Sequence, residues 1–294
     1  MIYSNVTSIF TDIKPDEPVF LRNLTVYPVC LSSENGLDVA SVDEVMDNAL
    51  GEFHELDTPQ IGEIRFGNRG DKPVLMLDGE EITGSLQNRI IAASTFIESR
   101  ISANIEVICA EEGRWSELGI FKTGYCSYPG IRALLSRHGR KENGVQKTIW
   151  KEIERKLTAT QTLSSTSSMH DIYNNLQEEV DRYVEDFESL NHNTSGIIGV
   201  AGGKILGCDI FHSPSIYRKF ENRLLRSYAL DAIEHRKPGS RNCDTTDFLE
   251  EIKQVLQKKT RIGKSRHFSL KSSSLSGQGT IYQGQIIHLS AFPK

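Results

Sequence analysis

The first half of the chain carries short apolar and alternating segments, a pattern typical of strands. Isolated turn residues such as Asn68 to Asp71 separate them. The segments with this strand pattern are Phe20 to Leu31, Ile61 to Phe66, Pro73 to Leu77, Arg89 to Ile97 and Ala103 to Ala110. Their close succession predicts an antiparallel sheet over about residues 15 to 115, folded on itself as a barrel or sandwich.

From about residue 129 the apolar spacing becomes helical. Three stretches place apolar side chains three and four residues apart: Pro129 to Arg140, Val145 to Thr158 and His170 to Leu190. A β-hairpin turned by Gly202-Gly203 follows, and Ser213-Pro214 then predicts the start of a long helix that runs to about Glu234. One more helix and three closing strands complete the pattern.

The predicted class is therefore α+β, with an antiparallel barrel or sandwich first, a helical middle and a mixed C-terminal part. We divide the chain into a β-rich part at 1–128, a helical segment at 129–192 and a mixed part at 193–294, which together form one compact unit. Near the beginning, Ser41 and Glu44 have the spacing of a capping box and predict a short helix.

Composition narrows the classes of function. The 294 residues carry a formal net charge of −5, which gives no long-range attraction to a phosphate backbone and argues against generic nucleic-acid binding. No signal peptide pattern and no long apolar run occurs, so we expect a cytoplasmic protein that does not enter a membrane. The five cysteines are scattered without zinc-site spacing, which predicts reduced thiols and no metal site, and no cofactor motif occurs.

The densest polar cluster follows the most apolar strand. Glu80 and Glu81 come directly after it, and Gln87, Asn88 and Arg89 follow within a few residues. Carboxylates and amides recognise hydroxyls and bases, and arginine pairs bidentately with phosphate, so the cluster suits a sugar or nucleotide. The alternative is a solvated hairpin held by surface ion pairs.

A second group stands after the strand that ends at Ala110. Glu111, Arg114 and Trp115 can meet the first cluster if the strands pair antiparallel, and the indole can stack on a base or an arginine. We therefore expect Glu80, Arg89 and Arg114 on one rim. The alternative is a tryptophan that covers the barrel end while Arg114 bridges to Glu80 or Glu111.

A third group lies in the C-terminal part. On the long helix, Tyr228 and Asp231 share a face with leucines and should be buried, and Arg226 lies beside them. Asp209 precedes this helix, and His288 lies in the last strand. These five residues either support a site or lock the helix to the sheet by a buried hydrogen-bond network.

The segments PVLMLDGEEITGSLQNRI, EEGRW, GGKILGCDIF, LLRSYALDA and HLSAF occur in this order over nearly the whole chain. In this order they resemble the ARG and rhodanese-phosphatase-associated protein domain family, where ARG denotes ADP-ribosylglycohydrolase. The resemblance implies a place in NAD or ADP-ribose metabolism, in repair or in prokaryotic conflict systems. It also implies a partner from an ADP-ribose-processing system.

Three functions follow. The first is a binding module for ADP-ribose, NAD or a derived nucleotide, with Gln87, Asn88, Arg89, Glu111, Arg114 and Trp115 as ligand-binding residues. The second is a hydrolase or transferase on the same nucleotides, with Glu80 or Glu81 as base. The third is a protein-interaction scaffold. We expect carboxylates paired with arginine to be structural, and carboxylates that converge across a pocket to be catalytic.

Overall fold

The computed structural model describes residues 10, 13–31, 37–116, 118–138, 144–185, 187, 190–235, 243–258 and 266–294. The chain divides into two compact units. Unit 1 combines Met1–Leu37 with Glu179–Lys294, and unit 2 is the continuous segment Asp38–Glu178. The division at 1–128, 129–192 and 193–294 stays a prediction.

Unit 2 is built on the antiparallel barrel that the strand pattern predicts. Its strands are β5 (Gly51–His54), β6 (Glu63–Asn68), β8 (Glu80–Ser85), β9 (Arg89–Ile91), β11 (Ser102–Cys109) and β12 (Leu118–Cys126). They pair in the order β12-β8-β9-β11-β6-β5, and the contact of β12 with β5 nearly closes the barrel. Apolar side chains such as Ile64, Phe66, Ile82 and Val107 fill the interior.

A smaller sheet and a short helix accompany the barrel. The strands β10 (Thr95–Ile97), β7 (Val74–Met76) and β4 (Ala40–Ser41) form this sheet. The helix α2 (Val42–Asp47) begins with the predicted capping box: the Ser41 hydroxyl accepts from the Glu44 amide, and the Glu44 carboxylate accepts from the Ser41 amide. The cap satisfies amides that have no partner inside the helix.

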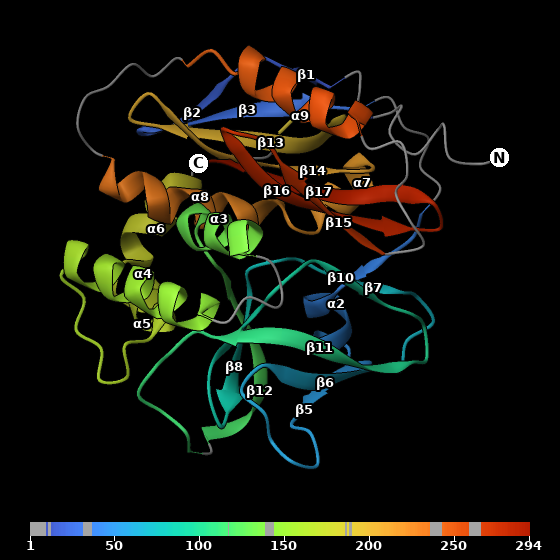
Figure 1. The fold of residues 1–294 in the computed structure, drawn as a ribbon, viewed down its shortest axis with the longest axis vertical. Helices are drawn as coiled ribbons and strands as arrows, with labels where there is room; N and C mark the ends of the chain where they lie inside the picture. The colour runs from blue at the N-terminus through green and yellow to red at the C-terminus, as the bar shows by residue number, and fades with distance from the viewer. Residues whose placement is uncertain are drawn as a thin grey trace. The chain divides into compact units, whose positions relative to one another are not determined.

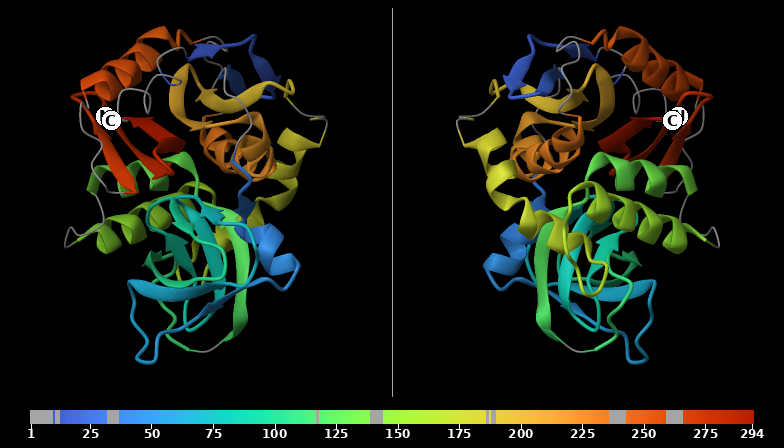
Figure 2. Two further views of the ribbon diagram at one scale, coloured as in Figure 1. Left: turned by 90° about the vertical axis from the view of Figure 1, so that its right-hand side faces the viewer. Right: turned by 90° about the vertical axis from the view of Figure 1, so that its left-hand side faces the viewer.

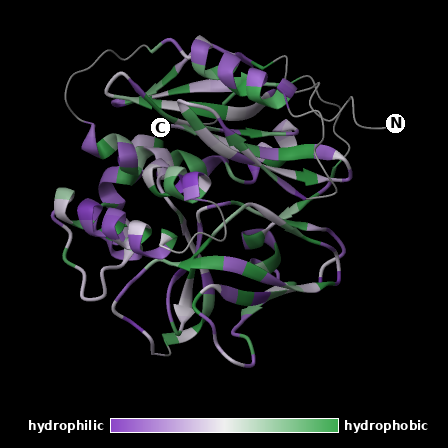
Figure 3. Cartoon of the chain, in the orientation of Figure 1, coloured by the Kyte–Doolittle hydropathy of each residue, from purple (hydrophilic) through white to green (hydrophobic). Residues whose placement is uncertain are grey.

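The helical middle of the sequence contributes α3 (Pro129–His138), α4 (Val145–Ala159), α5 (Met169–Asn175) and α6 (Gln177–Val184). The last two replace the single helix predicted from His170 to Leu190, because the chain leaves helical geometry at Leu176. In Figure 3, α4 alternates hydrophobic and hydrophilic positions, as expected for a helix with one buried face.

Unit 1 is an antiparallel sheet made from both ends of its sequence. Its strands are β1 (Lys14–Pro15), β2 (Val19–Leu21), β3 (Leu24–Cys30), β13 (Thr194–Ala201), β14 (Lys204–Phe211), β15 (His267–Lys271), β16 (Leu275–Tyr282) and β17 (Gln285–Pro293). Figure 1 shows β3 beside β13, its neighbour in the sheet. The expectation that this early strand belongs to the first-half barrel is wrong, because a local apolar pattern does not specify the partner strand.

Helices lie on both faces of this sheet (Figure 2). The helix α9 (Thr246–Lys258) buries Phe248, Leu249 and Ile252 against one face. On the other face, α8 (Glu221–Glu234) brings the Tyr228 ring onto β13, where a side chain at Gly199 would lie 2.2 Å from the ring. The predicted long helix is interrupted, since α7 (Pro214–Arg218) ends before α8 begins. Within the described ranges, no helix is long and apolar enough to cross a membrane.

Candidate functional site

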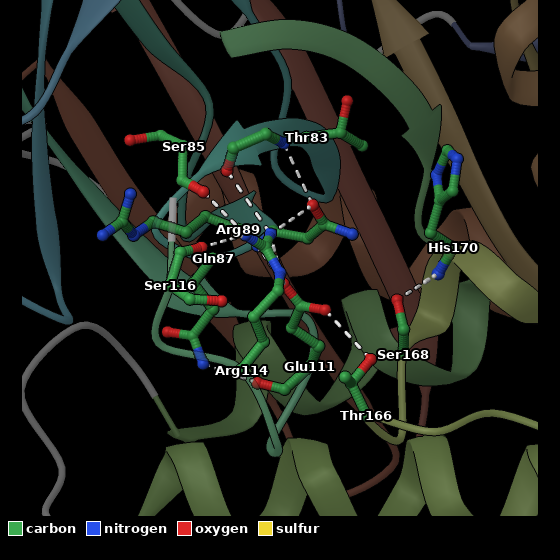
Figure 4. Close-up of polar contacts among 12 residues, drawn as sticks. Thr83, Ser85, Gln87, Arg89, Glu111, Arg114, Ser116, Thr166, Ser168 and His170 are labelled. Carbon is green, nitrogen blue, oxygen red and sulfur yellow. Dashed lines mark hydrogen bonds and ion pairs between the residues drawn. The ribbon is translucent and has the colours of Figure 1, made fainter. Parts of the chain in front are cut away.

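Glu111 is the centre of the polar cluster at one end of the unit 2 barrel. Its Oε1 accepts from the Asn88 amide at 2.6 Å and from Arg114 Nε at 2.8 Å, and its Oε2 accepts from the Thr166 hydroxyl at 3.1 Å. The Gln87 side chain donates to the Glu111 carbonyl at 2.7 Å. Figure 4 shows these side chains directed toward one another around Arg114.

Arg114 ties this cluster to the end of β8. Its guanidinium donates to the Ser85 carbonyl at 2.6 Å, to the Ser116 carbonyl at 2.8 Å and to Asn88 Oδ1 at 3.1 Å. The side chain is 11% exposed, and that of its partner Glu111 is 3% exposed. The arginine therefore neutralises the buried carboxylate and holds three chain segments together, as the structural alternative proposed.

Arg89 forms the neighbouring group on β9. Its guanidinium donates to both oxygens of Glu55, at 2.8 and 3.1 Å, and its side chain is fully buried. The guanidinium carbon lies 5.9 Å from the centre of the Trp115 ring. Since Trp115 is 49% exposed, this tryptophan presents an aromatic surface that rests on an ion-paired arginine.

A third ion pair joins the LDGEE segment to α3. Asp78 and Arg132 are both fully buried, with 3.2 Å between Asp78 Oδ2 and Arg132 Nε. The Ser94 hydroxyl donates to the other oxygen of Asp78 at 2.7 Å. Gly79 has φ +90°, and a Cβ there would lie 2.7 Å from Arg132 Cγ, so this position requires glycine for both reasons.

The two predicted bases have different surroundings. Glu80 is buried and accepts from the Leu77 amide at 2.7 Å. Glu81 is also buried, and its Oε2 lies 2.8 Å from Nδ1 of His170. Glu81 is therefore paired with a side chain that titrates near neutral pH.

The supporting residues lie in unit 1. The buried Asp209 carboxylate accepts from the Tyr228 hydroxyl at 2.9 Å and lies 2.9 Å from Nε2 of His288. Asp231 is 9% exposed, whereas Arg226 on α8 forms a partly exposed ion pair with Asp181 on α6. The network of Tyr228, Asp209 and His288 locks the helix to the sheet, as the structural alternative for this group proposed.

The sequence pattern of one family, the ARG and Rhodanese-Phosphatase-superfamily-associated Protein domain, matches residues 12–292. The match spans both units and every motif described above. The chain belongs to this family. Neither a curated protein nor a solved structure matches the chain.

In this ARPP-1 domain the predicted residues of unit 2 separate into one polar cluster and two glutamates that have other partners. Gln87, Asn88, Glu111 and Arg114 meet in one hydrogen-bonded cluster of unit 2, and Arg89 contacts Trp115 nearby, linked through Glu55 and Ser85. Glu80 accepts a hydrogen bond from the Leu77 amide, and Glu81 contacts His170. Both guanidinium groups are engaged by carboxylates. The expected rim of Glu80, Arg89 and Arg114 stays a prediction.

Sequence reasoning missed four polar partners: Glu55, Arg132, Thr166 and His170. Each lies at least 34 positions from its partner in the chain, so the spacing of nearby residues cannot predict the contact. His170 had one local signal, since Ser168 before it caps α5 by accepting from the His170 amide. That signal predicts a helix start and says nothing about Glu81.

Among the residues that the structure describes, the cysteines and potential metal ligands form no second site. The described cysteines are all thiols, and Cys109 lies in the barrel beside Gln87. Burial raises the pKa of the Cys109 thiol to about 12, which leaves it protonated and unreactive at neutral pH. No group of three histidine, cysteine or acidic side chains among the described residues is arranged to hold a metal ion.

Proposed function

We propose that this domain binds an ADP-ribose- or NAD-type nucleotide on the exposed face of unit 2 around Trp115. The observation that carries the proposal is the half-exposed indole seated 5.9 Å from the Arg89 guanidinium carbon. Because Glu55 holds that guanidinium on two oxygens, the platform is rigid before a ligand arrives. Stacking of a base on such a ring contributes about 1–3 kcal/mol.

The neighbouring polar groups suit the rest of a nucleotide. Arg114 is partly exposed, and the hydroxyl of Thr166 lies in the same cluster. Both arginines already pair with carboxylates, so they support the platform and contribute little net positive charge. We therefore expect recognition by stacking and hydrogen bonds, with a weak dependence on salt.

Isothermal titration of ADP-ribose, NAD and AMP into the full chain tests the proposal. Trp115→Ala should weaken binding about tenfold or more, while Trp115→Phe should keep most of it, because the stacking surface is largely preserved. Leu163→Ala is the matched control, since Leu163 is a 96% exposed apolar side chain outside the cluster. Absence of heat with millimolar nucleotide would refute the proposal.

A second candidate is a contact with a protein from an ADP-ribose-processing system. Trp115, Leu118 and Ile120 are 49, 65 and 79% exposed within six positions of the chain. Exposed apolar side chains at this density are typical of protein contacts. The variant Leu118→Glu with Ile120→Glu should abolish comigration with a purified ADP-ribosylglycohydrolase from the same organism and leave nucleotide binding intact.

The family association supports, for either candidate, a role in NAD or ADP-ribose metabolism or in a prokaryotic conflict system that uses such nucleotides. The two candidates differ in which substitution has the larger effect. Trp115→Ala should act on nucleotide binding, and the pair of glutamate substitutions should act on the protein contact.

A further inference from the structure

Glu81 and His170 form a contact that the platform around Trp115 does not use. Glu81 on β8 is fully buried, and His170 in the first turn of α5 is 30% exposed. Their Oε2 and Nδ1 atoms are 2.8 Å apart. One side chain is therefore withdrawn from solvent, and the other connects it to the surface.

The position of Glu81 is fixed by the strand beside it. The Tyr125 amide of β12 donates to Oε2 at 3.2 Å, and Gly124 leaves room for the carboxylate, because a Cβ there would lie 2.3 Å from Oε2. Oε1 of Glu81 is buried and has no hydrogen-bond partner among the described residues. Leaving a buried acceptor unsatisfied costs stability, so this arrangement is poorly explained by structure alone.

The charges around His170 favour its protonated form. Burial has the largest single effect and lowers the pKa of the imidazole, but the hydrogen bond and charge of Glu81, together with the charges of Asp171 and Glu111, outweigh it, so the pKa is raised overall. The Tyr125 ring, whose centre is 5.1 Å from that of the imidazole, faces it from β12. Because Nδ1 contacts Glu81, Nε2 is the nitrogen available to a ligand.

We propose that His170 and Glu81 are an acid–base pair that cleaves an O-glycosidic bond of an ADP-ribosyl compound, with His170 as the catalytic acid and Glu81 as its positioning residue. The nature of the substrate rests on the proposed nucleotide binding, and the pair itself rests on its own geometry. The glycosidic class follows from the surrounding charge: the buried Glu81 carboxylate, 2.8 Å from His170, and the neighbouring Asp171 stabilise a positively charged, oxocarbenium-like transition state and disfavour an anionic phosphoryl one.

The step balances with water as the second reactant. Nε2 of His170 gives its proton to the glycosidic oxygen as the bond from that oxygen to the ribose carbon breaks. The electron pair stays on the oxygen, which leaves as a hydroxyl group. Water adds to the ribose carbon through its oxygen, and the proton that it loses returns to Nε2. The products are ADP-ribose and the free alcohol.

The test measures release of ADP-ribose from a serine-linked ADP-ribosyl peptide by the full chain across pH. His170→Asn should lower kcat by about 10²-fold or more, as expected for loss of a general acid. Glu81→Gln should move the alkaline limb of the kcat profile to lower pH. The matched control is His54→Asn, because His54 also pairs with a glutamate, at 3.1 Å from Glu52, but is 52% exposed. It should leave the profile unchanged.

Three results would overturn the inference: no cleavage by the wild-type chain, an unchanged rate in His170→Asn, or release of AMP in place of ADP-ribose. If Glu81→Gln fails to fold, the partly exposed His170→Asn still decides the question. Nucleotide binding without cleavage would overturn this inference and keep the proposed function. Cleavage without measurable ADP-ribose binding would keep this inference and overturn the proposed function.

Discussion

The Asp78–Arg132 pair makes a strong prediction about stability. Both side chains are fully buried, so Arg132→Met leaves the Asp78 carboxylate without its charge partner in a site closed to water. Breaking a buried pair in this way costs about 3–5 kcal/mol. The control is Arg155→Met on α4, whose pair with Glu152 is short at 2.8 Å but has a 49% exposed arginine. It should cost less than about 1 kcal/mol.

Urea unfolding monitored by tryptophan fluorescence measures both free energies. The two tryptophans, Trp115 and Trp150, both belong to unit 2, so their signal reports the unfolding of the unit that contains the pair. Adding Asp78→Asn to Arg132→Met should recover part of the loss, since the uncompensated charge disappears. A difference below about 1 kcal/mol between Arg132→Met and Arg155→Met would refute the reasoning.

Three further predictions concern other buried groups. Tyr228→Phe keeps the ring but removes the donor to Asp209 in unit 1, and urea unfolding monitored by circular dichroism should show a loss of about 1–3 kcal/mol. The pKa of His170 in the folded protein is raised above 6.5. The stability that its protonated form contributes is therefore complete below pH 6.5 and is lost as the pH rises through the pKa of the folded state. The difference in melting temperature between wild type and His170→Asn should shrink from pH 6 to pH 9. Iodoacetamide at pH 8 should modify the partly exposed Cys243 and spare Cys109, as read by mass spectrometry.

The sequence predicted best what depends on neighbours in the chain. The capping box at Ser41, the apolar strand at Val74–Met76 and the hairpin at Gly202-Gly203 all follow from local spacing, and the structure confirms them. At the hairpin both glycines have positive φ, +59° and +74°, which side chains rarely adopt. The burial of Tyr228 likewise follows from its helical spacing among leucines.

Contacts between distant segments could not be predicted in the same way. Arg89 was expected to meet a ligand, yet it is fully buried and engages Glu55, which precedes it by 34 positions. Its substitution should therefore disturb stability as well as any binding. Similarly, the pairing of Glu81 with His170 depends on how α5 packs against β12, which periodicity does not encode.

The discontinuous make-up of unit 1 has a consequence for the order of events during synthesis. Strand β3 leaves the ribosome early, but its sheet neighbour β13 follows only after all of unit 2 has been translated. Unit 2 is one uninterrupted stretch of the chain, so it can fold before β13 is synthesised. During that time the edge of β3 that pairs with β13 has no partner strand. Such an edge is a template for pairing with other nascent chains, and the rate of translation through unit 2 sets how long it stays open.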